Sequence, residues 1–478
     1  MKLDKVSVNQ TLNKAESLLK EEQGLSPAMR AMFEILIMLI RAFTGRLNIN
    51  SSNSSIPPSA DKKRKRGSQK EKSNKKPGGQ NGHEGFRLEK SENPDEIIDI
   101  KIDKTTLPPG KYQEVGYEAR QIIDFVISKI VIEYRAQILE NLTGKQYVAE
   151  FPDYVKTDVQ YGYRVKSHAV YLSQFQFLPY ARVQSYFEEK MNIPISTGSI
   201  FNFNKEAYLL LDQFDKKAKS KLLAEKVLNA DETGINVNKK TIWLHSVSSG
   251  LWSYFYPHEK RGSEAMDEMG ILPHFTGTLI HDHWKPYFTY ACKHGLCNAH
   301  HIRELTYAHE EDKQSWAHDM KSLLLEINDA VNATEIKALP TGKCEEYKNK
   351  YREIIKTGEL ESPLPPSPLP TEPKRRGRVK KTKSRNLLER LRDFESDVLR
   401  FMEDPLVSFT NNSGENDLRM TKVQQKISGC FRSMEGARIF CRIRSYLLTC
   451  QKHKVTMTDA LELLFQGKIP AFMVDENR

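Results

Sequence analysis

The sequence predicts an α/β protein made of several units, and three observations lead to that prediction. The chain has 478 residues, too many for one ordinary hydrophobic core, and 38% of them are hydrophobic. Apolar runs separated by polar turns over 227–256 predict strands, and another strand-like run follows at 277–282. Helical periodicity precedes these runs at 165–225 and follows them at 300–362, so we expect helices to flank a sheet.

The first 90 residues divide into a helical segment, 1–46, and a basic linker, 47–90. A Ser-Pro start at residue 26 predicts a helix over 26–43. Its apolar residues recur at steps of three and four, namely Met29, Met32, Leu36, Leu39 and Phe43. Such a helix either mediates self-association or packs on its own chain, and the pattern leaves both open.

The linker is rich in Ser, Asn, Pro, Gly and Lys, a composition with too little apolar surface to fold alone. We expect it to act as an arm that binds DNA phosphates. The basic residues at its centre are Lys62, Lys63, Arg64, Lys65 and Arg66.

Two further units are expected before the sheet. Alternation of apolar and polar residues predicts a small β-rich unit at 91–155. The unit at 156–225 is helical, and 182–207 has the pattern of a helix, a Pro-containing turn and a second helix. That order suits a helix-turn-helix that binds DNA, with a plain helical hairpin as the alternative.

The remaining chain divides into a sheet region at 226–300, a helical insertion at 301–400 and a C-terminal part at 401–478. The insertion contains a Pro-rich run followed by a basic run, 362–385, which predicts an exposed connector. The C-terminal part is basic, with nine Lys or Arg between Leu418 and Lys454 against the single acid Glu435. Helical pattern resumes at Asn386.

The charge balance favours a nucleic-acid partner. Lys and Arg number 73 against 62 Asp and Glu, which gives a net charge of +11 and a pI near 9.1. The most apolar stretch, 33–43, contains charged residues and is too short to span a bilayer, so no membrane partner is expected. The N-terminus lacks a signal-peptide core, and six cysteines do not suggest a disulfide framework. We therefore expect a cytoplasmic protein.

Three carboxylates stand among these basic segments. Asp231 and Asp282 each end a strand-like run, a position held rigidly at the edge of a sheet where α/β proteins place their sites. Glu415 follows an Asn-Asn-Ser-Gly break that is expected to begin a helix, whose N-terminal dipole suits an acid. Such oxygen ligands suit Mg²⁺ or Mn²⁺, and two such ions can drive an in-line displacement at a phosphodiester.

Several motifs carry a resemblance to a known family. In chain order they are SSNSSIPPSADK, KKPGGQNGHEG, NADETG, HDHWKPYF, CNAHHIREL and NNSGENDLRMTKVQQKISGCFRS. With these motifs the sequence resembles the DDE transposases of the bacterial insertion-sequence-sixty-six family. The resemblance extends from about residue 47 to about residue 465.

The resemblance implies an RNase H-like catalytic core, a mixed sheet with flanking helices, in which Asp231, Asp282 and Glu415 bind Mg²⁺ or Mn²⁺. It implies a transposase that nicks the terminal inverted repeats of an insertion sequence and joins the 3′-hydroxyl ends to target DNA, acting as a homo-oligomer at the nucleoid. Further DNA contacts are expected from basic residues beside these motifs, namely Lys285, Arg419, Lys422, Lys426 and Arg432. Family members often carry a Cys-rich zinc unit, but residues 88–226 contain no cysteine, so zinc is not expected.

Two other functions remain open: an inactive DNA-binding protein that recognises inverted repeats, and a nuclease of related fold. Glu232 adjoins Asp231, but neighbouring strand residues point to opposite faces. Glu304 is a second competing acid, and its basic surroundings indicate an ion pair instead.

Other residues near the motifs also allow two roles. Cys292, Cys297 and His300 offer an alternative zinc site, although their spacing is unusual. Arg419 either holds a phosphate or pairs with Glu415. Trp284 either packs or, with Lys285 and Tyr287, contacts an unpaired DNA end.

Overall fold

This computed structural model describes residues 5–22, 24–47, 50, 54, 88–364 and 381–474. Two compact units share the chain, one drawn from 1–64, 150–186 and 194–478 and the other from 65–149 and 187–193. The cluster Lys62 to Arg66 and most of the predicted 362–385 connector lie outside the described residues.

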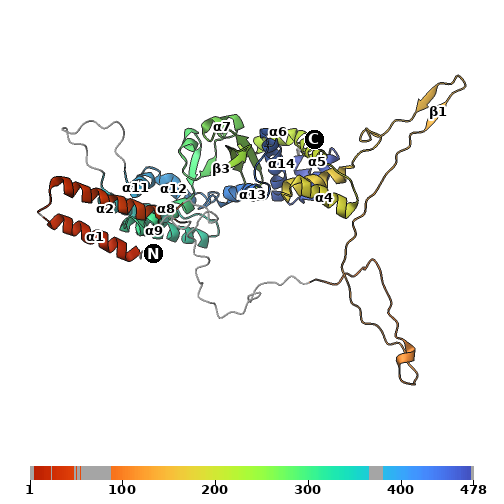
Figure 1. The fold of residues 1–478 in the computed structure, drawn as a ribbon, viewed down its shortest axis with the longest axis horizontal. Helices are drawn as coiled ribbons and strands as arrows, with labels where there is room; N and C mark the ends of the chain where they lie inside the picture. Colours follow the sequence, from red (N-terminus) through yellow and green to blue (C-terminus); the bar gives the residue numbers. More distant parts are fainter. Residues whose placement is uncertain are drawn as a thin grey trace. The chain divides into compact units, whose positions relative to one another are not determined.

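A five-stranded mixed sheet forms the centre of the first unit (Figure 1). Its strands are β3 (Val227–Val237), β4 (Lys240–Ser248), β5 (Ser253–His258), β6 (Thr278–His281) and β7 (Lys293–Leu296). In the spatial order β5-β4-β3-β6-β7, the first three strands are antiparallel, and β6 and β7 run parallel to β3. The predicted α/β class and the strands at 227–256 and 277–282 are confirmed.

The turn between β3 and β4 shows why the hairpin forms at this point. Asn238 and Lys239 both have positive φ, 47° and 66°, which is the geometry of a two-residue hairpin turn whose twist matches the adjoining strands. Asparagine tolerates this conformation better than most residues do. The hairpin brings the apolar residues Ile235 and Ile242 opposite each other.

Two C-terminal helices pack on this sheet, α13 (Asn412–Ser428) against β3 and β4, and α14 (Met434–Lys452) against β5 (Figure 1). Because strand residues alternate between faces, Ile235 and Val237 of β3 meet Leu418 of α13 on one face. This buried cluster fixes the position of α13 relative to β3. These two elements carry two of the predicted site residues, Glu415 and Asp231.

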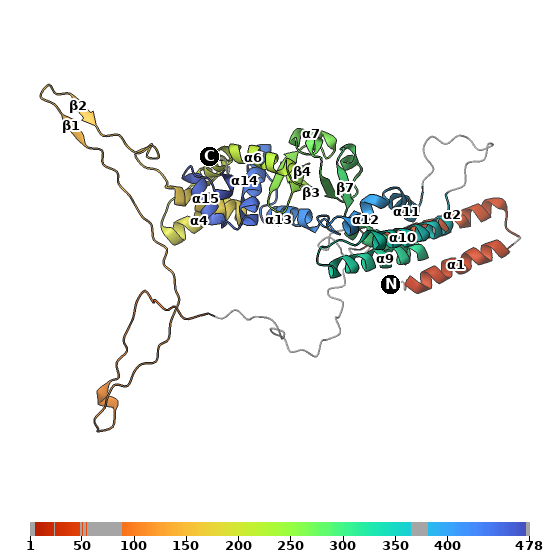
Figure 2. The same ribbon diagram turned by 180° about the vertical axis from the view of Figure 1, so that it is seen from behind.

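A helical bundle adjoins the β7 side of the sheet (Figure 2). Its helices are α8 (Asn298–Glu310), α9 (Ser315–Ala333), α10 (Thr341–Glu361), α11 (Lys383–Asp393) and α12 (Glu395–Glu403). At one crossing a Cβ on Gly358 would lie 2.7 Å from Leu388 and 3.0 Å from Trp316, so glycine is what permits the close approach. The helical pattern predicted at 300–362 is confirmed.

The helices before the sheet are α3 (Tyr163–Val170), a π-helical turn (Tyr171–Phe175), α4 (Tyr180–Met191), α5 (Thr197–Leu210) and α6 (Asp212–Leu223). The helix, turn and helix predicted over 182–207 are therefore present, with Ser196 capping α5 through its hydroxyl, which accepts the N–H of Ser199 at 3.0 Å. The C-terminal helix α15 (Met457–Phe465) packs on α3 and α5.

Short helices complete the described elements. They are α7 (Ser263–Met269) and 3₁₀ turns at Lys104–Thr106, Leu272–His274, Lys285–Thr289 and Ala471–Met473. Helix α7 ends at Gly270, whose φ of 73° gives the left-handed C-terminal cap that glycine adopts without steric cost.

The β-rich unit predicted at 91–155 contains less strand than its pattern indicated. Over the described residues 88–149, only β1 (Ile138–Glu140) and β2 (Gln146–Val148) form, as one antiparallel hairpin. The alternating runs around Ile100 and Val126 are not strands, and these two side chains are 93% and 92% exposed. Alternation needs a second apolar layer to be buried against, and an isolated hairpin does not supply one.

The N-terminal segment is a pair of helices, α1 (Lys5–Glu21) and α2 (Pro27–Leu47), that pack on each other through the buried Leu12 and Ile37. The helix predicted at 26–43 is confirmed. Its stepped apolar residues, from Met29 to Phe43, are exposed, and self-association stays a prediction. In the part of the chain that the structure describes, no helix is both long and apolar enough to cross a membrane.

Candidate functional site

The parallel pairing of β3 and β6 brings two of the predicted site residues to one edge of the sheet. The last paired residues are Asn229 on β3 and Ile280 on β6. Two positions further along the chain come Asp231, which lies inside β3 and not at its end as predicted, and Asp282, which directly follows β6. Matched positions on adjacent parallel strands are neighbours, so the register itself places these two carboxylates together.

The electrostatics of Asp231 show how closely the acids are grouped. Burial raises the pKa of Asp231 well above its ordinary value, and the negative charges of Glu232, Asp282 and Glu415 raise it further. One hydrogen bond acts in the opposite direction, from the Glu232 N–H to Asp231 Oδ1 at 2.9 Å. The two predicted aspartates and the predicted glutamate therefore share one partly buried region.

A local turn fixes the side chain of Asp282. Its Oδ1 accepts the N–H of Trp284 at 3.0 Å, an Asx turn, and the residue between them, His283, has a φ of 69°. The left-handed backbone conformation of His283 allows the chain to turn sharply at the end of β6. As a result, Asp282 is held at the end of the strand and does not continue the ladder.

Glu415 lies in the first turn of α13, as predicted, and the buried Asn411 just before that helix fixes its place. The Asn411 amide donates to the Ala230 carbonyl at 2.9 Å and accepts from Asn229 Nδ2 at 2.8 Å. The Asn411 N–H also donates to Cys297 Sγ at 3.1 Å. Asn411 therefore ties the helix of Glu415 both to the strand of Asp231 and to the start of α8.

Gly414 allows this close packing. A Cβ at Gly414 would lie 3.0 Å from Asn411 Oδ1 and 3.4 Å from the Asn229 Cβ. Any larger residue would push against the amide that connects α13 to β3. The Asn-Asn-Ser-Gly break therefore serves as the attachment of α13 as well as its beginning.

Replacing Asn411 with alanine should loosen this attachment. The change leaves the buried Ala230 carbonyl and the Asn229 amide without their partner, which costs roughly 1–3 kcal/mol of unfolding free energy. Urea denaturation measures this cost. The control is Asn412→Ala at the adjacent exposed position, where a change within about 0.5 kcal/mol is expected. Equal stability of the two variants would contradict the role of Asn411.

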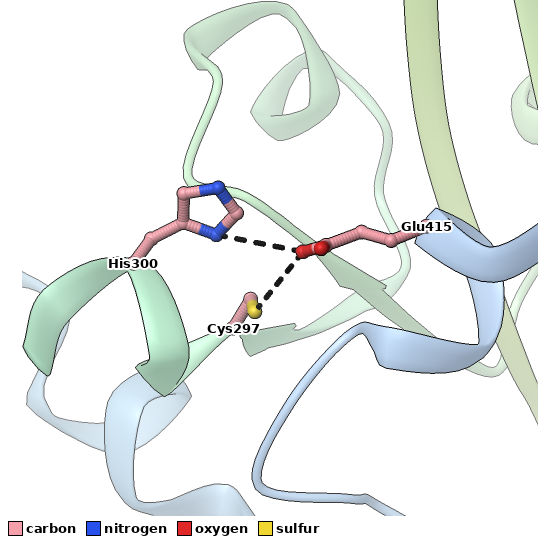
Figure 3. Close-up of side chains that lie close together, drawn as sticks. All are labelled: Cys297, His300 and Glu415. Carbon is pink, nitrogen blue, oxygen red and sulfur yellow. Dashed lines mark hydrogen bonds and ion pairs between the residues drawn. The ribbon is translucent and has the colours of Figure 1, made fainter. Parts of the chain in front are cut away.

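Cys297 and His300, at the start of α8, both approach Glu415 (Figure 3). Cys297 Sγ and His300 Nδ1 each lie 3.9 Å from Glu415 Oε1. Burial raises the pKa of the Cys297 thiol to about 11, so sulfur is present as S–H and donates toward the carboxylate. Burial also lowers the pKa of His300, and its Nδ1 is buried without a hydrogen-bond partner among the described residues.

The zinc alternative is not supported by this arrangement. Among the described residues, Cys292 belongs to no group whose ligand atoms lie within 4.8 Å of one another. Cys297 and His300 do belong to such a group, but its third member is Glu415, and Cys297 Sγ accepts the Asn411 N–H. The structure therefore does not bring Cys292, Cys297 and His300 together as one set of ligands.

A second group whose potential ligand atoms lie within 4.8 Å of one another consists of His258, Glu264 and Glu268. It lies beside a pocket of about 180 Å³. His258 Nδ1 accepts the Lys260 N–H at 3.0 Å, which in neutral imidazole leaves the proton on Nε2. Nε2 lies 3.4 Å from Glu268 Oε2 and therefore points a donor at it. Its hydrogen bonds account for the arrangement of this group without an ion.

The main site does fit a divalent cation. The charges of Asp282 and Glu415 both raise the pKa of Asp231, and a bound cation would offset that effect. Their oxygens suit Mg²⁺ or Mn²⁺. Within the described residues the three carboxylates are not all within 4.8 Å of one another, because Glu415 lies toward Cys297 and His300.

The two competing acids are engaged elsewhere. Glu232 accepts from Arg261 Nη2 at 2.7 Å and from the Tyr287 hydroxyl at 2.5 Å, on the face of β3 opposite to α13. Arg261 lies over the rings of Trp243 and Trp284, so Trp284 packs against Arg261, and a DNA contact by Trp284 stays a prediction. The other acid, Glu304, forms an ion pair with Arg390 of α11, also as expected.

Five of the predicted DNA contacts lie near the acids along the chain. Lys285 follows Asp282 closely, and Arg419 is one helical turn beyond Glu415; both are exposed. Lys422 donates to the Gly234 carbonyl, whereas Lys426 and Arg432 are exposed. Within the described residues no ion pair joins Arg419 to Glu415, which leaves Arg419 available to a phosphate. The contacts themselves remain predictions.

The sequence did not point to Asn229, Asn411 or Arg261, and it suggested a DNA contact for Tyr287, not its hydrogen bond to Glu232. A signal existed for the two asparagines, because each is close to a predicted catalytic acid, in NADETG and in NNSGEN. A polar residue with no charge beside a predicted metal ligand is a candidate for positioning it. No comparable signal marked Arg261 and Tyr287, whose contacts join distant segments.

Comparison with known protein families identifies the chain. A family model described as the Transposase IS66 family matches residues 158–439, a span that contains the sheet, the bundle and all three acids. The chain belongs to the transposase IS66 family. The resemblance seen in the motifs is thereby confirmed.

Membership makes the transposase a DNA-processing enzyme that binds DNA, and it does not favour the inactive alternative. A second model, a family of unknown function (DUF6444), matches residues 7–89, which include α2 and the basic linker. A search of curated proteins found no match.

Proposed function

We propose that the transposase nicks the terminal inverted repeats of an insertion sequence and joins the 3′-hydroxyl ends to target DNA. Asp231, Asp282 and Glu415 are the proposed catalytic residues and the ligands of Mg²⁺ or Mn²⁺. One observation carries this proposal: the three acids are separated by 51 and 133 positions (282 − 231 and 415 − 282), yet the charges of Asp282 and Glu415 both raise the pKa of Asp231.

The sheet topology supports an RNase H-like core. Strand β6 returns beside the first part of β3 and parallel to it, so the residue after β6, Asp282, comes near Asp231 in the middle of β3. Helix α13 then crosses the same edge and brings the third acid. The helices α9, α10 and α11 lie between the second and third acids and supply the helical insertion.

The chemistry follows from what these residues can hold. Divalent ions bound by the three carboxylates would polarise the scissile phosphodiester and stabilise the leaving oxygen, so no covalent nucleophile is needed. Exposed cations next to the acids, Lys285 and Arg419, would hold the flanking phosphates in place. Action on DNA would place the transposase at the bacterial nucleoid.

Self-association on DNA is part of the proposal. Helix α2 exposes Met29, Met32, Leu36, Leu39 and Phe43, between 45% and 66% of each side chain. An exposed apolar helix face of this size supports pairing between copies. Two copies would allow the two ends of one element to be processed together.

Strand cleavage of a duplex that carries the element's inverted repeat, in Mg²⁺, tests the function. We expect the wild type to cut and Asp282→Ala to be inactive while still binding the duplex. The exposed acid Asp319 of α9 provides the matched control, and Asp319→Ala should cut normally. Binding without cleavage by wild type and Asp282→Ala alike would establish the inactive DNA-binding alternative. Cleavage that ignores the repeat sequence would instead indicate a nuclease.

A further inference from the structure

We propose that His300 is an additional, nitrogen ligand of the metal ion bound at Glu415 and Asp282, and that it makes the transposase favour Mn²⁺ over Mg²⁺. The inference rests on the proposed function and extends it. It assigns a role to a residue that neither the three-acid motif nor the family match explains.

The position of His300 leads to this assignment. Helix α8 begins at Asn298, so His300 lies in its first turn, and its ring points at the Glu415 carboxylate (Figure 3). Nδ1 is 3.9 Å from Glu415 Oε1, too far for a hydrogen bond. A gap of this length leaves space for a ligand between the two atoms, and the charge of Asp282 also acts on the ring.

The state of the ring suits a ligand. Its Nδ1 is buried, and no described residue gives it a hydrogen bond. An unpartnered buried polar atom costs free energy, so such an atom in an otherwise ordered site calls for a partner that is bound during function. An imidazole nitrogen in this position offers the lone pair that a transition-metal ion takes from histidine.

Cys297 does not take this role, although its sulfur is equally close to Glu415. Sγ already accepts the Asn411 N–H at 3.1 Å. This interaction holds the start of α13, so Cys297 is a positioning residue. The Nδ1 atom of His300, in contrast, has no hydrogen-bond partner among the described residues.

A nitrogen ligand changes which ion the site prefers. Carboxylates alone serve Mg²⁺ and Mn²⁺, whereas imidazole adds little to Mg²⁺ binding and suits the transition metals. A site with oxygen ligands and one imidazole nitrogen should therefore bind Mn²⁺ more tightly than Mg²⁺. His300 would account for that difference.

The experiment measures bound metal directly, without DNA and without activity. Electron spin echo spectroscopy of Mn²⁺ on the full-length transposase detects coupling to a ¹⁴N ligand, and titration calorimetry gives the Mn²⁺ and Mg²⁺ affinities. We expect a ¹⁴N coupling in the wild type and its loss in His300→Gln. Mn²⁺ affinity should fall about 10-fold or more in that variant, while Mg²⁺ affinity changes by less than about 3-fold.

Two controls separate ligation from a structural effect. Cys297→Ser, in the same cluster, should keep the ¹⁴N coupling, since its hydroxyl can still accept the Asn411 N–H. His300→Gly should lose the coupling and regain it when free imidazole is added, which a structural role for His300 would not produce.

The outcomes that overturn the two proposals differ. Suppose that Mn²⁺ binds the wild type and that Glu415→Gln abolishes this binding. If His300→Gln then retains the ¹⁴N coupling or the wild-type Mn²⁺ affinity, the role of His300 is refuted and the proposed metal site is not. If the wild type binds no Mn²⁺ and Asp282→Ala cuts DNA as well as wild type, the metal site itself is refuted.

Discussion

Glu415→Gln is expected to abolish strand cleavage and to leave most of the DNA affinity. The amide has almost the shape of the carboxylate but no charge, so the site loses a metal ligand without losing its packing. Loss of several kcal/mol of transition-state stabilisation corresponds to a fall in rate of roughly 10³-fold or more. Affinity should persist, because it arises from Lys and Arg contacts to phosphates.

Parallel measurements of cleavage and binding test this expectation. Fluorescence anisotropy on a repeat duplex at several salt concentrations gives the affinity, which should fall steeply with salt to the same degree in variant and wild type. Glu435→Gln is the matched control, since Glu435 is an exposed acid of the same basic segment that pairs with Lys205 at 2.8 Å. A Glu415→Gln protein that binds and cuts normally would remove Glu415 from the site.

Asp231→Asn is expected to abolish cleavage and, in metal-free protein, to raise stability at neutral pH. Burial, followed by Glu232, Asp282 and Glu415, raises the pKa of Asp231 above its ordinary value of 3.8. Between that value and the raised one, the folded state binds more protons than the unfolded state does, so the free energy of unfolding falls as pH rises. Asparagine removes this penalty because it never ionises.

Urea denaturation with chelator at two pH values checks the sign. The difference in midpoint between Asp231→Asn and wild type should be small at pH 4 and larger at pH 7.5. At pH 7.5, Mg²⁺ should reduce this difference in midpoint, because it stabilises only the wild type. Asp319→Asn, at an exposed position, should show no such dependence. A gap that shrinks as pH rises would contradict the crowding of acids at Asp231.

The sequence was most informative where a segment's structure depends on its own pattern. The runs at 227–256, rich in apolar and aromatic residues and separated by polar turns, formed strands, and the stepped apolar residues from Met29 to Phe43 formed a helix. The Asn-Asn-Ser-Gly break began α13 with Glu415 in its first turn. In each case the preference is local, so a single sequence contains it.

Pattern alone failed where burial depends on a partner. The alternating residues around Ile100 and Val126 have the composition of strands, yet they remain exposed and unpaired by any ladder in the described structure. Strand β7 had no signal of its own, since it carries only Lys293, His294, Gly295 and Leu296. It forms because β6 offers a free parallel edge.

By itself, the sequence determined the kinds of residue at the site: three carboxylates with basic residues beside them. The predicted strand end at Asp231 was wrong, because β3 continues to Val237 through its hairpin with β4. Only the tertiary structure decided how the three carboxylates meet. The parallel register of β3 and β6 places Asp231 beside Asp282. The buried Asn411 attaches α13, the helix that carries Glu415, to β3. The tertiary structure also places the His300 ring next to the Glu415 carboxylate. These contacts join residues at least 51 positions apart, and their geometry is set by the packing of the whole core, which no local pattern encodes.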